Sequence, residues 1–166
     1  MTRTIVTQPL TPEAFAPYGQ VITTTGAELR LINQGMTQRF HDLAKIELGG
    51  NNFRPLISLF RGKPYTLPLS LTMVERHPLG SQAFFPLSDR PYLSIVAPDD
   101  DGIPGEPLSF LVPPGTGVNI AMNTWHGVLT PLGDSEADFL VVDRGGDGDN
   151  LEEHHFTTPW TVVAGN

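Results

Sequence analysis

The stretch Leu67-Pro-Leu-Ser-Leu-Thr-Met-Val-Glu-Arg-His77 decides the fold of this chain. Its odd positions hold three Leu, a Met, a Glu and a His. Because residues two apart in a strand share a face, the pattern predicts an apolar strand face that ends in Glu75 and His77, while Arg76 points to the opposite side. A buried carboxylate needs a partner, so this pair at the mouth of a barrel is a candidate functional site. The alternative is that both side chains are solvated beyond the core.

Further short segments along the chain have a period of two or a β-rich composition, and Gly, Pro, Asn or Asp bound them. The 17 Gly and 16 Pro among 166 residues fit many tight connections. No amphipathic helices separate the segments, so we expect an all-β protein, an antiparallel barrel or sandwich with a few short helices. The other predicted strands are Glu28 to Asn33, Phe53 to Arg61, Gln82 to Leu87, Tyr92 to Ala97, Leu108 to Val112, Val118 to Met122 and Ala137 to Arg144.

One short helix is predicted to begin after Thr11, where Pro12 and Glu13 supply a first-turn proline and acid. It should end by Gly19. The region 39–48 fits neither a helix nor a strand period cleanly, so both stay open. The acidic loop 98–105 is expected to be a solvated hairpin connection. Without an internal repeat or linker, residues 1–166 are expected to form a single domain.

Composition excludes several classes of function. The net charge of -8 argues against nucleic acid or an anionic membrane as the main partner, because both require a basic surface. The absence of cysteine excludes disulfides, zinc–thiolate sites and a cysteine nucleophile. No apolar run is long enough for a signal peptide or a membrane span, so we expect a cytoplasmic protein.

Gln82 follows His77 by five residues, and the turn between them predicts a hairpin that returns Gln82 beside Glu75 and His77. The spacing Glu-x-His-x4-Gln matches the frame of the first cupin motif, His-x-His-x4-Glu, and Pro113-Pro-Gly115 with His126 falls where the second motif would be. Gln is a neutral oxygen donor in place of an anionic ligand. An exchangeable divalent metal on Glu75, His77, Gln82 and His126 is therefore compatible with the pattern but not required by it, and no organic cofactor is expected.

Three other groups allow two interpretations each. His126 follows a Trp and is either a packed core residue or a catalytic group. Asp143 and Arg144 precede two glycines and form either a surface ion pair or a place where a small anion approaches the backbone. The run Glu152-Glu-His-His155 resembles a ligand cluster, but it follows a glycine-rich stretch, so we expect a solvated tail.

Taken together, these segments resemble the ureidoglycolate lyase family of allantoin degradation, a cupin-like family. The resemblance covers most of the chain in order, and the strings around Glu75 and Asp143 are long enough to be specific. It implies a cupin-type fold, a homodimer, and cleavage of (S)-ureidoglycolate to glyoxylate and urea. The matching strings are Leu10-Thr-Pro-Glu-Ala-Phe-Ala-Pro-Tyr-Gly19, Arg39-Phe-His-Asp42, Glu75-Arg-His-Pro-Leu-Gly-Ser-Gln-Ala-Phe84, Gly117-Val-Asn119, Asn123-Thr-Trp-His126 and Asp138-Phe-Leu-Val-Val-Asp-Arg-Gly-Gly146.

That reaction sets three tasks for the chain. A base accepts the hydroxyl proton, an acid or metal assists the departing urea nitrogen, and an Arg grips the carboxylate. His77 or Glu75 is the expected proton-transfer group, His126 the group that assists departure, and Gln82 the residue that orients the substrate. The expected substrate-binding residues are Arg61, Arg76, Arg144 and Asn123.

Two other functions remain open from the sequence. An amidohydrolase acting on the same substrate would release ammonia and carbon dioxide with glyoxylate. A non-catalytic cupin would bind a small carboxylate without turnover. The coexistence of Glu75, His77, Gln82 and His126 favours an enzyme, because a simple binding module has little need for two imidazoles and an acid.

Overall fold

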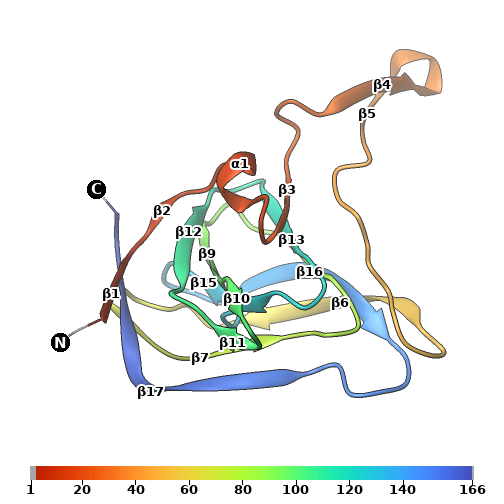
Figure 1. Cartoon of the computed structure of the whole chain (residues 1–166). Coiled ribbons are helices and arrows are strands. Elements are labelled where there is room, and N and C mark those ends of the chain that lie inside the picture. Colours follow the sequence, from red (N-terminus) through yellow and green to blue (C-terminus); the bar gives the residue numbers. More distant parts are fainter. Residues whose placement is uncertain (1–2, 166) are drawn as a thin grey trace.

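The structure, a computed structural model, describes residues 3–165, and nearly all of its regular secondary structure is strand (Figure 1). An eight-stranded sheet and a five-stranded sheet make up the body. In the larger sheet the order is β1 (Arg3–Val6), β17 (Glu152–Val163), β7 (Leu69–Arg76), β14 (Trp125–His126), β9 (Tyr92–Ala97), β12 (Leu108–Val112) and β2 (Gln8–Pro9), with β15 (Thr130–Pro131) also on β9. In the smaller sheet it is β3 (Gly19–Ile22), β13 (Gly117–Ile120), β8 (Gln82–Pro86), β16 (Ala137–Gly145) and β6 (Arg54–Gly62).

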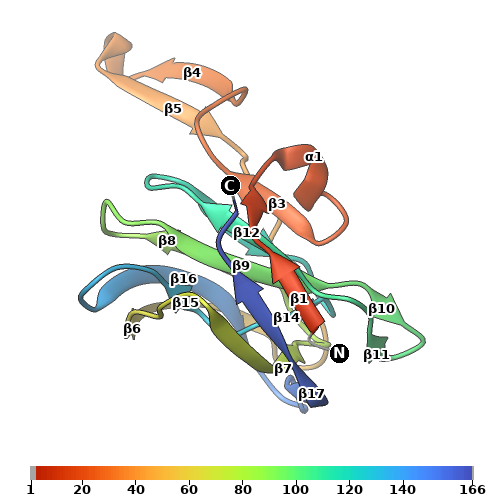
Figure 2. The same cartoon turned by 90° about the vertical axis from the view of Figure 1, so that its left-hand side faces the viewer.

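Three short elements complete the described chain. Helix α1 (Pro12–Phe15) begins as predicted, with the Thr11 hydroxyl accepting the backbone N–H of Ala14 at 3.1 Å. The acidic loop forms the small hairpin β10 (Asp99–Asp100) and β11 (Ile103–Pro104). A second hairpin, β4 (Glu28–Ile32) and β5 (Thr37–His41), joined by a 3-10 turn (Asn33–Gly35), projects from the body (Figure 2).

The main core lies between the two sheets. Tyr92 of the larger sheet meets Phe139 of the smaller one edge to face, with ring centroids 5.0 Å apart. Phe15 of α1 closes one side and packs on Phe110. A second apolar cluster, which includes Leu93 of β9, lies on the other face of the larger sheet, so β9 is buried on both faces.

The predicted all-β fold is confirmed, and most predicted strands are present with small differences at their ends. The strands Tyr92–Ala97 and Leu108–Val112 have the predicted bounds. Most pairings are antiparallel, but β1 pairs with β17 and β2 with β12 in parallel. Among residues 3–165, no helix has both the length and the apolar character needed to span a membrane.

The expectation of a solvated tail at residues 152–155 was wrong. These residues begin β17, which pairs antiparallel with β7 over most of its length. Several of their side chains are exposed, so the composition resembles that of a tail. The backbone is nevertheless ordered, because its hydrogen-bonding partner is a strand about 80 positions earlier in the sequence.

The alternation predicted along β7 is also interrupted. Leu71 and Val74 are three positions apart, yet both are buried in the second apolar cluster. The pairing of β7 with β17 shifts register in the same region, between His155 and Trp160. Glu75 therefore faces the barrel interior because the strand changes phase, and not because it continues the face of Leu71.

Candidate active site

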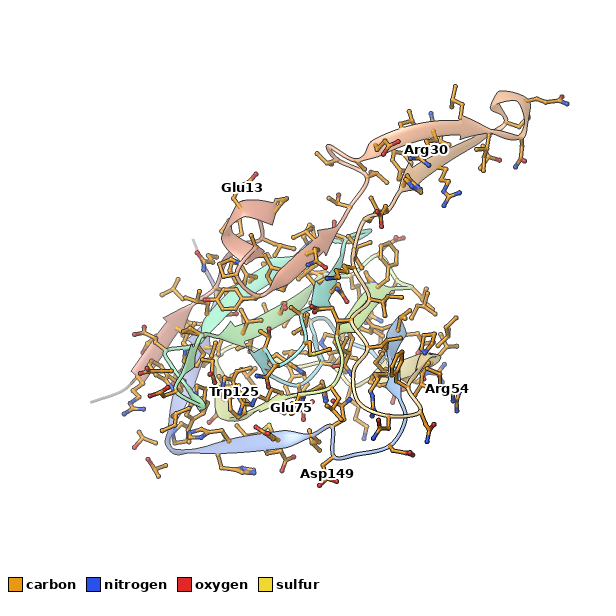
Figure 3. The ribbon with its side chains drawn as sticks, turned by 45° about the vertical axis from the view of Figure 1, so that its right-hand side comes forward. Glu13, Arg30, Arg54, Glu75, Trp125 and Asp149 are labelled. Atoms are coloured by element: carbon orange, nitrogen blue, oxygen red, sulfur yellow. The ribbon has the colours of Figure 1, made fainter. Side chains whose placement is uncertain are left out.

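Strands β7, β14 and β8 bring the predicted catalytic residues to one end of the barrel interior. Glu75 on β7 is the direct antiparallel partner of His126 on β14. His77 follows β7 immediately, and its backbone carbonyl accepts the N–H of Asn123 at 2.9 Å. Glu75, Gln82 and His126 line a pocket together with Phe60, Arg61, Gly62, Phe84, Val128 and Leu129. Figure 3 shows Glu75 in the body of the molecule, far from the projecting hairpin that carries Arg30.

Glu75, His77 and His126 form a compact cluster of potential metal ligands. One ligand atom from each residue lies within 4.8 Å of those of the other two. The Nε2 atom of His77 is 3.8 Å from Oε1 of Glu75, and the centroids of the two imidazole rings are 5.1 Å apart. A cation or a transferable proton would be stabilised at the centre of this arrangement.

Hydrogen bonds to backbone carbonyls set the orientation of both imidazoles. Nδ1 of His77 donates to the carbonyl of Asn150 at 2.8 Å, and Nδ1 of His126 donates to the carbonyl of Gly127 at 2.9 Å. In the neutral rings Nε2 then carries the lone pair. Both Nε2 atoms are buried, and neither has a hydrogen-bond partner within the described residues. Buried polar atoms are normally paired, so these two ring nitrogens indicate a site for a ligand or metal.

Burial favours the neutral forms of Glu75 and His126. Desolvation raises the pKa of Glu75, and the nearby Glu153 raises it further, while His77 opposes the shift. Burial lowers the pKa of His126 to about 4, and the charge of His77 acts in the same direction against the hydrogen bond to Gly127. His126 is therefore neutral near pH 7, and its Nε2 lone pair is available to accept a hydrogen bond or to bind a metal.

Gln82 is held by a residue that sequence reasoning did not assign to the site. Its amide nitrogen donates to Oδ2 of Asp143 at 3.3 Å. The other carboxylate oxygen of Asp143 is buried without a hydrogen-bond partner among residues 3–165. Since the amide nitrogen is engaged, the amide oxygen of Gln82 is the atom available to a ligand. The position of Asp143 at the end of an alternating strand was a signal of an inward side chain, but the adjacent Arg144 and two glycines fitted a surface ion pair or an anion site equally well.

The arginines predicted to bind substrate are all engaged in other contacts. Arg76 bonds Glu152 at 2.6 Å and Asp99 at 2.9 Å, and its guanidinium lies 4.4 Å from the ring centroid of Trp125. Arg144 is buried and donates to three backbone carbonyls, those of Gly49, Asn51 and Asp147.

Of the three arginines predicted to bind substrate, only Arg61 lines the pocket. Its guanidinium forms a bidentate pair with Asp138 at 2.7 and 2.9 Å. This pair raises the pKa of Arg61 and lowers the pKa of Asp138. Asn123 lies close to His77 through its backbone and has a left-handed φ of 63°.

Comparison with known proteins gives a consistent result. The Ureidoglycolate lyase family model matches residues 2–163. Proteins named ureidoglycolate lyase are similar over nearly their whole length: 59% identity in Chelativorans sp., covering 96% of each chain, and 58% in Mesorhizobium japonicum, covering 98% of each. The relative from Brucella anthropi is 53% identical over 93% of this chain and 90% of its own. Among solved structures, a mutant of Bacillus subtilis oxalate decarboxylase aligns with a TM-score of 0.37 and 13% identity over 61% of this chain, which spans about a quarter (24%) of that protein.

Proposed function

Because the chain belongs to the ureidoglycolate lyase family, we propose that it cleaves (S)-ureidoglycolate to glyoxylate and urea in the pocket lined by Glu75, Gln82 and His126, with His77 beside Glu75. One observation supports the assignment of this reaction to the pocket. Two buried imidazole Nε2 atoms, which have no hydrogen-bond partner among residues 3–165, lie beside a carboxyl group whose pKa is raised. This combination of groups suits a site that moves a proton on a small polar substrate.

The reaction moves one proton between two atoms attached to the same carbon. The substrate carbon carries a hydroxyl, a carboxylate and a ureido nitrogen. The hydroxyl proton is removed, the carbon–nitrogen bond breaks as the glyoxylate carbonyl forms, and the ureido nitrogen takes up a proton to leave as urea. No other reactant is consumed. A single carboxyl group beside that carbon is therefore able to accept the first proton and deliver it to the nitrogen.

We assign this proton transfer to Glu75. A carboxyl group whose pKa is raised by desolvation takes up and returns a proton more readily near neutral pH than an ordinary one. His126, predicted from the sequence to assist the departing nitrogen, is neutral and presents a lone pair at Nε2. It therefore suits acceptance of a hydrogen bond from the substrate, as does His77, whose Nδ1 is held in the same way.

Gln82 and Arg61 are proposed to recognise the two ends of the substrate. The Gln82 amide oxygen suits the N–H groups of the ureido end, because its amide nitrogen is bound to Asp143. Arg61 uses Nε and Nη2 for Asp138, which leaves Nη1 for a substrate carboxylate. Its long, largely exposed side chain has the freedom to turn towards the pocket that the residue lines.

The same cluster fits a divalent metal. Two imidazole Nε2 atoms and one carboxylate, with both imidazoles oriented through Nδ1 by backbone carbonyls, make a ligand set of the kind found in metal sites. Gln82 would add a neutral oxygen. When bound, a metal would polarise the substrate hydroxyl and make its proton easier to remove. Three protein ligands and a weak fourth favour an exchangeable ion.

Product analysis tests the proposed function. Purified protein is incubated with (S)-ureidoglycolate, and urea, ammonia and glyoxylate are each measured directly. Stoichiometric urea is expected. Ammonia released without added urease would instead indicate an amidohydrolase, and glyoxylate binding without turnover would indicate a non-catalytic binding protein. Glu75→Gln, which keeps the size and removes the titratable group, should abolish most urea release.

A further inference from the structure

Asn150 contacts the turn after His77 through two of its own atoms. Its backbone carbonyl accepts the Nδ1–H of His77 at 2.8 Å, and its side-chain Oδ1 accepts the backbone N–H of Leu79 at 2.7 Å. Asn150 lies in the loop between β16 and β17, more than 70 positions from both partners. Because His77 and Leu79 are two positions apart, the two hydrogen bonds close a ring. A shift of Asn150 therefore disturbs both contacts together.

The segment between the two contact points is short and stiff. Pro78 joins His77 to Leu79, and its ring fixes its own φ and disfavours helical backbone at His77. The imidazole of His77 is still able to rotate about its side-chain bonds. Among residues 3–165 that ring has one hydrogen bond, the one to the Asn150 carbonyl. The orientation of the ring therefore depends on where that carbonyl lies.

The loop that carries Asn150 is anchored three residues earlier, at Asp147. Nη2 of the buried Arg144 donates to the Asp147 carbonyl. The side-chain amide of Asn52 donates to the Asp147 carboxylate at 2.6 Å. Arg144 also packs closely on Gly80 in the turn after His77, where an added Cβ would lie 2.5 Å from the Arg144 Cβ. The loop and the turn are thus held against each other before a substrate arrives.

The other imidazole of the site needs no such distant partner. Nδ1 of His126 donates to the carbonyl of Gly127, the next residue in the chain. His126 also lies within β14 and pairs directly with Glu75. His77, in contrast, follows the last residue of β7, so the sheet does not fix its ring. The two histidines therefore differ in what orients them.

We propose that Asn150 is a positioning residue that keeps the His77 ring protonated at Nδ1, with Nε2 directed towards Glu75. This role rests on the proposed function, in which Nε2 of His77 accepts a hydrogen bond from the substrate. Without the bond from Oδ1 to Leu79, the Asn150 carbonyl is free to move. The imidazole then turns, or exchanges its proton between the two nitrogens. Loss of a residue that orients a functional imidazole typically costs about tenfold to a hundredfold in activity.

The first test measures the His77 ring without substrate. Long-range proton–nitrogen NMR spectra of chelated protein at alkaline pH distinguish a ring protonated at Nδ1 from one protonated at Nε2, and His77→Asn assigns the signals. Asn150→Ala should shift the His77 signals towards a mixture of the two forms and leave those of His126 unchanged. Unchanged His77 signals in the folded variant would overturn the proposal. If Asn150→Ala does not fold, the shorter side chain of Asn150→Ser provides the same comparison.

The second test measures urea release. Asn150→Ala should lower kcat/KM about tenfold. Asn150→Asp keeps an oxygen acceptor for the Leu79 N–H and should retain most of the parent rate. Asp149→Ala, at the exposed neighbour in the same loop, is the matched control and should behave like the parent (Figure 3). Melting temperatures establish that each variant is folded. Equal rates for Asn150→Ala and the parent would contradict the proposed role.

A double substitution separates this role from a general structural one. In a His77→Asn background, Asn150→Ala should cause little further loss of kcat/KM, because the imidazole to be oriented is gone. A further loss of the same size as in the parent would show that Asn150 does not act through His77. A parent that releases no urea would refute the proposed function, whereas the spectra still decide whether Asn150 orients His77.

Discussion

Glu75 and His126 are direct cross-strand partners of β7 and β14, and this pairing is the foundation of the candidate site. Directly opposed residues of an antiparallel pair have their Cβ atoms about 5 Å apart. The separation between carboxyl group and imidazole is therefore set by the hydrogen-bonded ladder of a sheet and not by a loop. Such a site is held in its working geometry before a substrate arrives.

Replacing His77 by Asn should leave the fold nearly intact and remove most activity. Asn is smaller and still able to donate a hydrogen bond near the Asn150 carbonyl that His77 contacts, so we expect a loss of about 1 kcal/mol in unfolding free energy. The imidazole Nε2 that lies 3.8 Å from the Glu75 carboxylate is lost. Because this atom is proposed to hold the substrate beside Glu75, urea release should fall about a hundredfold. Turnover and melting temperature are measured on one preparation. His155→Asn, at an exposed histidine outside the pocket, is the control. Normal melting with more than about a tenth of the parent rate would make His77 a structural residue.

A bound metal should be exchangeable and not structural. The two apolar clusters of the fold contain neither Glu75 nor His77, so little of the fold depends on an ion. Chelation should remove the metal and lower activity, while the melting temperature changes by only a few degrees. Elemental analysis before and after chelation, together with melting curves, gives the answer. A stoichiometric ion whose removal unfolds the chain would contradict this expectation.

The burial of His126 predicts a loss of stability in acid. Its pKa is about 4 in the folded protein and near 6.5 when unfolded, so the unfolded chain binds the proton first as pH falls. The contribution is fully present above pH 6.5 and is lost progressively towards pH 4, up to about 3 kcal/mol. The unfolding free energy of chelated protein is measured by denaturant titration across this range. His126→Gln should show a shallower decline, and parallel curves for parent and variant would refute the assignment.

Arg61→Gln tests the carboxylate contact. If Nη1 of Arg61 binds the substrate, the variant should raise KM about tenfold or more and change kcat less. The reason is that a charge-assisted hydrogen bond is lost in both the substrate complex and the transition state. Arg90→Gln is the control, since Arg90 binds Ser135 and lies outside the pocket. An unchanged KM for Arg61→Gln would move carboxylate binding to another residue.

Local patterns in the sequence were sufficient for the fold class but not for every contact. Strands such as Tyr92–Ala97 carry their own composition signal and were predicted with the observed bounds. The grouping of Glu75 with His77 was also correct, although the change of phase between Leu71 and Val74 shows that simple alternation was not the reason. Strand β17 was missed, because its order comes from pairing with the distant β7.

Arginine roles were hardest to predict, for a physical reason. A charged side chain near glycines is equally consistent with an anion-binding site and with a residue that holds a loop in place by hydrogen bonds. Arg144 holds carbonyls of residues more than 90 positions away, including Gly49, and only the folded chain brings them together. The same applies to Asp143, whose contact with Gln82 spans 61 positions.

That contact leads to the last prediction, that Asp143 orients Gln82. The Gln82 amide has two orientations that differ by exchange of oxygen and nitrogen, and an acceptor at Asp143 Oδ2 selects the one with nitrogen towards it. Asp143→Ala removes the acceptor and lets the amide turn over. One hydrogen bond contributes about 1 kcal/mol, so kcat/KM should fall about fivefold to tenfold. Asp143→Asn keeps one carbonyl acceptor and should retain more activity.

A double substitution separates this role from a general structural one. If Asp143 acts through Gln82, then Asp143→Ala should have little further effect on kcat/KM in a Gln82→Ala background, because the amide to be oriented is gone. The melting temperatures of the single variants establish how much stability each residue contributes. Asp149→Ala, at an exposed position after the same strand, is the control and should behave like the parent. Additive losses in the double variant would show that Asp143 and Gln82 act independently, and the amide of Gln82 would then be oriented by the substrate itself.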